Sequence, residues 1–201
     1  MKKILTILLS SLAISALANT TETSGAYIGL DAGIATTANY STNLDSSNNF
    51  ATALTIGYAF NPYLATEFEY LYVAPNSTDK NVTNNIKMTE KINNSFSTIA
   101  VKGILPLGDS FNLFAKVGAG LNYASFNYSV SDVASESFSS TNFTYLAGVG
   151  IDYNISPNVK ISLADTYYIP TTDAIGQTKD LATSFSFGKA NFASLGIAYT
   201  Y

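Results

Sequence analysis

Large apolar residues alternate with small or polar residues along most of the chain. In residues 26–35, Ile28, Leu30 and Ile34 fall on one face, and Asp31 falls on the other face among glycines. A period of two residues is typical of a β-strand, because successive side chains point to opposite faces of a sheet. The pattern predicts eight strands, at residues 26–35, 50–60, 64–73, 96–105, 111–124, 143–155, 159–168 and 190–201.

One face of these predicted strands is large and apolar, whereas the other carries glycine, alanine, threonine and charge. A soluble barrel points its apolar face inward and needs a polar face toward water. The second face here is too small and too rich in glycine to face water, and it suits a narrow lumen. We therefore predict an all-β fold, an eight-stranded antiparallel up-and-down transmembrane β-barrel. The alternatives are ten strands, with a hairpin added in the second or fourth loop, and a soluble periplasmic ligand-binding barrel.

The connections between the predicted strands alternate in length. The short ones contain proline or glycine, at residues 61–63, 106–110 and 156–158. The long ones are rich in Asn, Ser and Thr, at residues 36–49, 74–95, 125–142 and 170–189. Outer-membrane barrels have short periplasmic turns and long external loops. The alternation predicts four surface loops and places both ends of the barrel in the periplasm.

Tyrosine and phenylalanine recur at both ends of the predicted strands on the lipid-facing side. Aromatic side chains concentrate where a bilayer meets water, so two rims of them are expected around the barrel. The periplasmic rim would contain Tyr58, Phe60, Phe111, Tyr153, Tyr199 and Tyr201. The outer rim would contain Phe50, Tyr70, Tyr72, Tyr123, Phe143 and Tyr145, with Tyr168 as a further candidate.

The first eighteen residues have the pattern of a secretory signal peptide. Two lysines after Met1 precede the mostly apolar residues 4–17, and Ala16-Leu17-Ala18 is a small-x-small cleavage site. A membrane anchor would need about 20 apolar residues. We expect cleavage between Ala18 and Asn19, which leaves residues 19–201 as an exported barrel domain and indicates an integral protein of a bacterial outer membrane.

The composition excludes several classes of function. The chain has no cysteine, histidine or tryptophan, its ten basic residues are all lysine, and only 12% of its residues are charged. Disulfides, thiolate sites, imidazole zinc sites and Ser-His-Asp triads are therefore excluded. Ten lysines against fourteen acids are a poor basis for binding nucleic acid, where cations must neutralise phosphates. We expect neither enzymatic activity nor a cofactor.

Most charges of the predicted strands fall on the lumen face and at similar heights. Seven residues form the expected cluster: Asp31, Glu67, Glu69, Lys102, Lys116, Asp152 and Asp165. At about 3.3 Å per residue they lie roughly 10–20 Å along their strands from the periplasmic end. Because unpaired buried charge is unfavourable, we interpret the cluster as a salt-bridge network that fills the lumen and fixes strand register. An ion path or gate that favours cations is the alternative.

Asp165 is difficult to place within this cluster. If Val159, Ile161 and Leu163 face lipid, strict alternation puts Asp165 in lipid too, where a carboxylate is unfavourable. Either a β-bulge turns Asp165 inward, or the face assignment of this strand is shifted by one residue. We expect Asp165 to lie inward, and the register of this strand stays open.

The residues from about Gly25 to the end resemble the small outer-membrane barrels of the OmpA transmembrane type and the allied opacity-like and OmpX-like proteins. The best local match runs from Leu146 to Tyr153 through a proline turn to residues 159–168. One departure is that the family's seventh strand usually carries an arginine, and this chain has none. The final alternating residues resemble the family's C-terminal assembly signal: Leu195, Ile197, Tyr199 and Tyr201.

This resemblance implies a non-enzymatic surface protein that gives the envelope structure and displays loops for adhesion or host interaction. The alternative is a narrow porin-like channel for ions or small solutes. The expected partners are outer-membrane lipid and lipopolysaccharide, the barrel assembly machinery and periplasmic chaperones, and a host-surface ligand for the loops. Nucleic acid is not among them.

Overall fold

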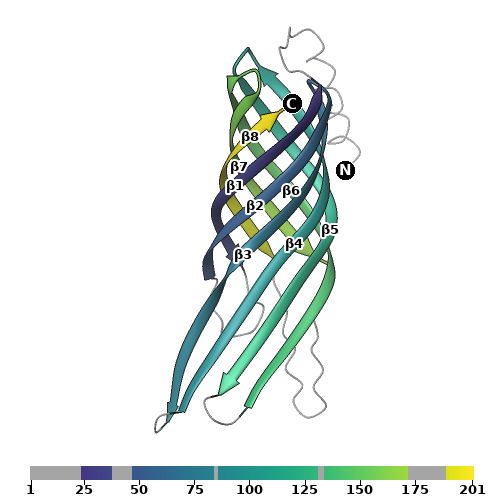
Figure 1. The fold of residues 1–201 in the computed structure, drawn as a ribbon. Coiled ribbons are helices and arrows are strands. Elements are labelled where there is room, and N and C mark those ends of the chain that lie inside the picture. Colours follow the sequence, from purple (N-terminus) through teal and green to yellow (C-terminus); the bar gives the residue numbers. More distant parts are fainter. Residues whose placement is uncertain (1–23, 38–46, 84–85, 131–133, 172–188) are drawn as a thin grey trace, which may run out of the picture.

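A computed structural model of the chain describes residues 24–37, 47–83, 86–130, 134–171 and 189–201. Eight antiparallel strands form a closed barrel, in which each strand pairs with its neighbours in sequence and β8 closes on β1 (Figure 1). The strands are β1 Gly25–Thr37, β2 Ser47–Asn61, β3 Leu64–Thr83, β4 Ile86–Leu107, β5 Phe111–Val130, β6 Ala134–Ser156, β7 Val159–Pro170 and β8 Ala190–Thr200. The prediction of eight strands is confirmed, and the ten-strand alternative is wrong.

The alternation of the sequence becomes the two faces of the barrel. Large apolar side chains point outward, and Leu30, Ile99 and Val117 are 59%, 63% and 62% exposed. Small and polar side chains point inward, together with a few large apolar ones that are buried there. Among the described residues, no helix is long and apolar enough to cross a membrane.

The narrow lumen explains why glycines recur on the inner face. A Cβ added to Gly120 would collide with the carbonyl oxygen of Ser97 on the paired strand β4. A Cβ added to Gly33 would collide in the same way with the carbonyl oxygen of Ala193 on β8. Glycine therefore lets the backbones of adjacent strands approach closely where the barrel is most crowded.

Three short turns lie at one end of the barrel, called here the turn end, where the chain also finishes (Figure 1). They join β2 to β3 at residues 62–63, β4 to β5 at residues 108–110, and β6 to β7 at residues 157–158. Gly108 has a φ of +82°, a left-handed conformation that glycine adopts without strain. The expected signal peptide, residues 1–18, and its cleavage site at Ala18 and Asn19 lie outside the described residues.

At the opposite, loop end, four strands continue past the rest of the barrel (Figure 1). The last pair between β2 and β3 is Ala51 with Val73, yet β3 and β4 stay paired as far as Thr83 with Ile86. The β5–β6 ladder reaches Val130 with Ala134, and β4 and β5 also remain paired in this region. We call these continuations of β3, β4, β5 and β6 the projecting sheet.

Residues 74–95 and 125–142 are thus mostly strands, and their prediction as loops is wrong. Outside the lipid, no apolar face is required, so these Asn/Ser/Thr-rich segments lack the alternation that revealed the other strands. Their backbone N–H and C=O groups still pair across the ladders, so their hydrogen bonds form whatever the order of the side chains.

The aromatic rims lie on the outer face as expected, with one exception. Tyr58, Tyr153 and Tyr199 near the turn end are 43–47% exposed, and Phe143 and Tyr145 near the loop end are 45% and 53% exposed. Tyr168 is instead completely buried in the lumen, so its assignment to the outer rim is wrong. The reason is alternation itself, because its neighbour Tyr167 takes the outward position.

Two apolar groups pack inside the barrel, one on each side of the lumen charges. The group toward the loop end, called here the apolar layer, has Leu71, Phe96, Leu146, Tyr168 and Phe192 as its large members. The group toward the turn end consists of Tyr27, Ala65, Ile104 and Phe114. The lumen is therefore filled by side chains rather than open along its axis.

Candidate functional site

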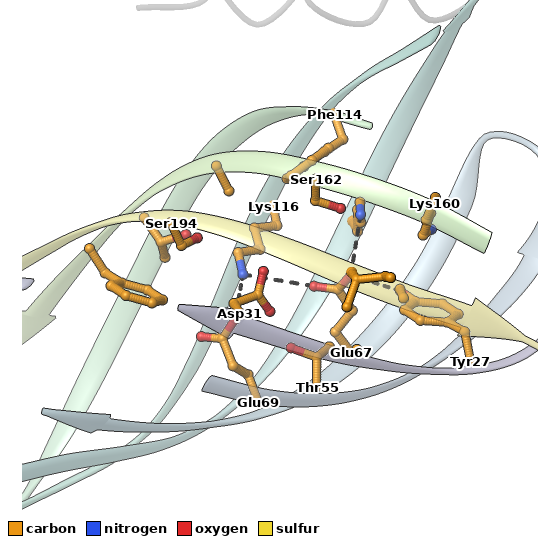
Figure 2. A pocket seen from close by; sticks show the side chains of 17 residues that line it. Tyr27, Asp31, Thr55, Glu67, Glu69, Phe114, Lys116, Lys160, Ser162 and Ser194 are labelled. Atoms are coloured by element: carbon orange, nitrogen blue, oxygen red, sulfur yellow. Dashed lines mark hydrogen bonds and ion pairs between the residues drawn. The ribbon is translucent and has the colours of Figure 1, made fainter. Parts of the chain in front are cut away.

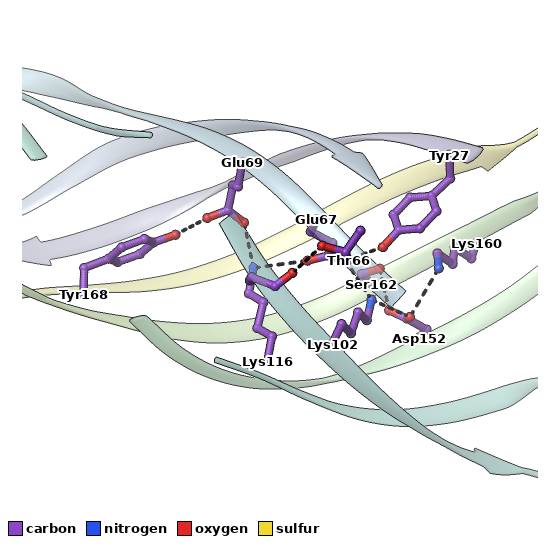
Figure 3. Close-up of polar contacts among 11 residues, drawn as sticks. Tyr27, Thr66, Glu67, Glu69, Lys102, Lys116, Asp152, Lys160, Ser162 and Tyr168 are labelled. Atoms are coloured by element: carbon purple, nitrogen blue, oxygen red, sulfur yellow. Dashed lines mark hydrogen bonds and ion pairs between the residues drawn. The ribbon is translucent and has the colours of Figure 1, made fainter. Parts of the chain in front are cut away.

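The charged side chains of the lumen form one connected chain of ion pairs. Lys102 on β4 lies with its Nζ 3.0 Å from Asp152 Oδ2 and 3.4 Å from Glu67 Oε1. Lys116 on β5 lies with its Nζ 2.6 Å from Glu69 Oε2 and 3.9 Å from Glu67 Oε2. Glu67 therefore links the two lysines, and the series runs across the lumen from Asp152 to Glu69 (Figure 3).

Hydroxyl groups donate hydrogen bonds to three of these carboxylates. Tyr27 Oη donates a hydrogen bond to Glu67 Oε1 at 2.7 Å, and Ser162 Oγ donates to Asp152 Oδ1 at 2.6 Å. Tyr168 Oη donates to Glu69. These bonds tie the ion pairs of β3, β4, β5 and β6 to β1 and β7 (Figure 3).

Burial makes this network important for stability. The side chains of Lys102, Glu67 and Asp152 are 5%, 6% and 0% exposed. Removing one partner of a buried ion pair leaves an uncompensated charge and destabilises by roughly 3–5 kcal/mol. Since the two residues of each ion pair lie on different strands, the network also favours one register of the barrel over slipped registers.

Lys160 belongs to the network, although the sequence analysis did not include it. Its Nζ lies 3.7 Å from Asp152 Oδ2 and 4.6 Å from the centre of the Tyr27 ring. The sequence contains a signal for this position of Lys160. If Val159 and Ile161 face lipid, alternation puts Lys160 inside the barrel. The difficulty of Asp165 on the same strand obscured it.

The structure places six of the seven expected cluster residues in the lumen: Asp31, Glu67, Glu69, Lys102, Lys116 and Asp152. Glu67 and Lys102, which lie on the neighbouring strands β3 and β4, are in contact there. Asp31 lines a cavity of about 40 Å³ together with Glu67, Glu69 and Lys116, and Figure 2 shows it directed into that space.

Asp165 is the exception, and its predicted inward orientation is wrong. The ladders from β7 to β6 and β8 run through Asp165 without a bulge, pairing it with Val149 and Ala193. The register shift between β6 and β7 lies at Asn154 and Ser156, beside the turn. Alternation therefore continues unbroken, and the Asp165 side chain is exposed on the outer face.

The four residues of the expected assembly signal form a row on the outer face at the end of the chain. Leu195, Ile197, Tyr199 and Tyr201 are 60%, 53%, 46% and 75% exposed. The rings of Tyr199 and Tyr201 lie edge to face with their centres 5.2 Å apart. The row is therefore accessible from the lipid side and ends in an aromatic pair.

Two cavities in the described part of the lumen meet at Tyr27 and Lys160, which line both. The one at the turn end has a volume of about 240 Å³ and is also lined by Asp109, Asn154 and Asn158. On the other side of the charges, the apolar layer closes the lumen, with the Phe96 and Tyr168 rings 4.7 Å apart. Among the described residues, no group of three or more acids could hold a metal ion.

Comparison with known proteins adds to this geometry. Residues 4–200 match the family described as outer membrane protein beta-barrel domain. A protein of Coxiella burnetii, described as uncharacterized, is 26% identical over 194 residues, which cover 84% of this chain and 75% of that protein.

The solved structures that share the fold include the following two. One is Ail, the attachment invasion locus protein of Yersinia pestis, in complex with the heparin analogue sucrose octasulfate. It has a TM-score of 0.60 and 17% identity, covering 89% of this chain and 99% of Ail. The other, neisserial surface protein A, has a TM-score of 0.60 and 15% identity, covering 90% of this chain and all of the solved chain.

Proposed function

The chain belongs to the outer membrane protein beta-barrel domain family, and on that premise we propose that it is a non-enzymatic surface protein. It gives structure to the bacterial outer membrane and displays its loop end for adhesion or host interaction. The rigid barrel provides the anchor, and the segments beyond it provide the contacts.

The projecting sheet is the observation that carries this proposal. It continues β3, β4, β5 and β6 well beyond the last pairs that close the barrel, which are Ala51 with Val73 and Thr144 with Pro170. Residues 74–83 of β3 extend by about 33 Å at 3.3 Å per residue. A paired sheet of this length holds its tip away from the membrane, as a binding surface requires.

The interior of the barrel supports a structural role rather than catalysis. Lys102, Lys116 and the carboxylates that face them already neutralise one another at 2.6–3.4 Å. A general acid or base needs an accessible group and space for a substrate, whereas these groups are buried among side chains. The absence of histidine from the sequence removes the commonest base of catalytic triads as well.

The proposal includes an orientation and partners. The turn end and both ends of the barrel face the periplasm, and the projecting sheet faces outward through lipopolysaccharide. The row of Leu195, Ile197, Tyr199 and Tyr201 is the segment that the barrel assembly machinery binds after chaperones have delivered the chain. The loop end binds a host-surface ligand, a role consistent with the attachment function in the name of Ail.

A narrow channel is the second candidate, and the charged cavities favour it. The cavities of about 40 and 240 Å³ are both lined by ionisable side chains and meet at Tyr27 and Lys160. The apolar layer opposes it, because a narrow apolar constriction excludes water and ions. We therefore place the channel second.

Shortening the projecting sheet tests the leading proposal. In one variant, residues 76–92 are replaced by a two-residue turn, which leaves the barrel ladders intact. Expressed in a non-adherent bacterial host, the full chain is expected to confer binding to host cells, and the shortened variant to lose it. Heat-modifiable gel migration checks that both barrels fold.

Two outcomes would contradict the proposal. One is equal adherence by folded full-length and shortened proteins, which would remove the projecting sheet from any role in binding. The other is discrete single-channel conductance from a protein that confers no adherence, which would favour the channel instead.

A further inference from the structure

Asp165 is the one charged side chain that the described strands place on the outer face between the two aromatic rims. No hydrogen bond or ion pair joins it to another described residue. Its large neighbours on the same face of β7 and β8, Leu163 and Leu195, are 61% and 60% exposed, as lipid-facing residues are. A lipid-facing carboxyl group is unfavourable, and such groups mark functional contacts.

The depth of Asp165 is close to the middle of the membrane. Its partner on β6 is Val149, which lies four residues from the rim residue Tyr145 and four from the rim residue Tyr153. Each separation is about 13 Å along the strand. A side chain as short as aspartate cannot reach the headgroups from this position, so a lipid headgroup cannot be its partner.

Two alanines lie near Asp165 on the outer face, among the larger Leu163, Tyr167 and Val149. The partner of Asp165 on β8 is Ala193, and Ala147 on β6 pairs with Tyr167, two residues along β7 from Asp165. Both alanines are exposed on the outer face. In membranes, contacts between proteins are enriched in small residues, because these allow the backbones to approach closely. Another protein surface could therefore reach the carboxyl group here.

From these observations we propose that two copies of this chain associate in the membrane through the β7–β8 face, with Asp165 at the centre of the contact. All copies insert in the same direction, so a two-fold axis along the membrane normal brings each residue opposite itself at its own depth. The two Asp165 carboxyl groups then lie against each other, one donating a hydrogen bond to the other. Each copy supplies the polar group that the other lacks at this depth.

Cysteine cross-linking tests this contact directly, because the chain contains no cysteine of its own. The test variant is Ala193→Cys, beside Asp165. The matched control is Val101→Cys on β4, which is 52% exposed and whose partner on β5, Val117, lies midway between the rim residues Phe111 and Tyr123. After mild oxidation of intact outer membranes, we expect a disulfide-linked homodimer from Ala193→Cys and monomer from Val101→Cys.

Substitutions at Asp165 in the Ala193→Cys chain then test its role. Asp165→Leu removes the polar group. We expect the association constant of the dimer to fall about tenfold, which is the effect of losing one hydrogen bond within the membrane. Asp165→Asn should preserve the dimer, because an amide both donates and accepts. Heat-modifiable migration checks folding, and the two cysteine variants decide the question even if Asp165→Leu does not fold.

Three results would overturn the proposal. Equal cross-linking at both cysteines would indicate random collision, and a folded Ala193→Cys protein that stays monomeric would exclude the contact. A disulfide or photocross-link to a different protein at this face would replace the second copy with that partner. None of these results depends on what the loop end binds, so the proposed function is tested separately.

Discussion

Lys102 Nζ lies 3.0 Å from Asp152 Oδ2, and this ion pair joins β4 to β6, two strands that are not neighbours in the barrel. Strand ladders connect only adjacent strands, so the pair acts as a brace across the lumen. Lys102 also contacts Glu67 on β3 at 3.4 Å, so its substitution removes two ion pairs of the network at once.

Lys102→Met is therefore expected to lower the free energy of unfolding by about 3 kcal/mol, because it removes the nearer of two cations from each of two buried carboxylates, Glu67 and Asp152. Urea titration of the protein folded in lipid vesicles, followed by heat-modifiable migration, measures the change. The matched control is Val101→Met, one residue along β4 and facing outward, which should change stability little. Equal stability of the two variants would contradict the role assigned to the network.

Tyr27→Phe should lower the free energy of unfolding by about 2 kcal/mol. It removes the hydroxyl that donates to Glu67 Oε1 at 2.7 Å, and hydrogen bonds to charged groups contribute about 1.5–3 kcal/mol. Tyr145→Phe, on the outer rim, is the comparison, and the same urea titration applies. A larger effect at Tyr145 than at Tyr27 would show that the rim, not the lumen, needs its hydroxyl groups.

Gly120→Ala should reduce the folded fraction and destabilise the barrel by about 1–3 kcal/mol, the range for overpacking. The new Cβ would meet the Ser97 carbonyl oxygen, and a backbone atom held in a ladder cannot move aside. Gly103→Ala is the control, because its Cβ would find its nearest neighbour, the Ala115 carbonyl oxygen, at 3.9 Å. Similar folded fractions in a refolding assay would contradict this account of the glycines.

Phe96→Ala combined with Phe192→Ala should open the lumen, because these substitutions remove two large members of the apolar layer. In planar bilayers we expect no discrete conductance from the native chain and cation-preferring steps from the double variant. The preference follows from four lumen acids against three lysines: Asp31, Glu67, Glu69 and Asp152, and Lys102, Lys116 and Lys160.

Phe143→Ala, on the outer face, serves as the control for this conductance measurement. Steps in the native protein would show that the apolar layer does not close the lumen. Strong anion selectivity in the double variant would contradict the charge argument.

The sequence predicted the barrel well because lipid imposes a strict pattern on it. Each strand within the membrane must show an apolar face, and so the faces of β1 to β6 and β8 could be read from alternation. Alternation does not predict the projecting sheet, since paired strands in water need no apolar face. Tyr168 was misplaced for a different reason: an aromatic residue near a strand end fits either a rim or a filled lumen.

The misplacement of Asp165 and the omission of Lys160 share one cause. The expectation that a carboxylate avoids lipid conflicts with the alternation of Val159, Ile161 and Leu163. Followed strictly, that alternation places Lys160 inside and Asp165 outside, as the structure has them. The distances within the lumen network could not be predicted, because they depend on how the strands wrap around the axis.

The pairing of β1 with β8 has a consequence for the order of events in biogenesis. All other ladders join strands that are consecutive in the chain, whereas this seam pairs Tyr27 with Thr200 and Thr37 with Ala190. The local hairpins can form early, but the seam waits for the last residues to be delivered. Until then the sheet has two unsatisfied edges, β1 and its last formed strand, which are templates for aggregation. Closure of the β1–β8 seam is therefore the step at which a faulty chain would aggregate instead of folding.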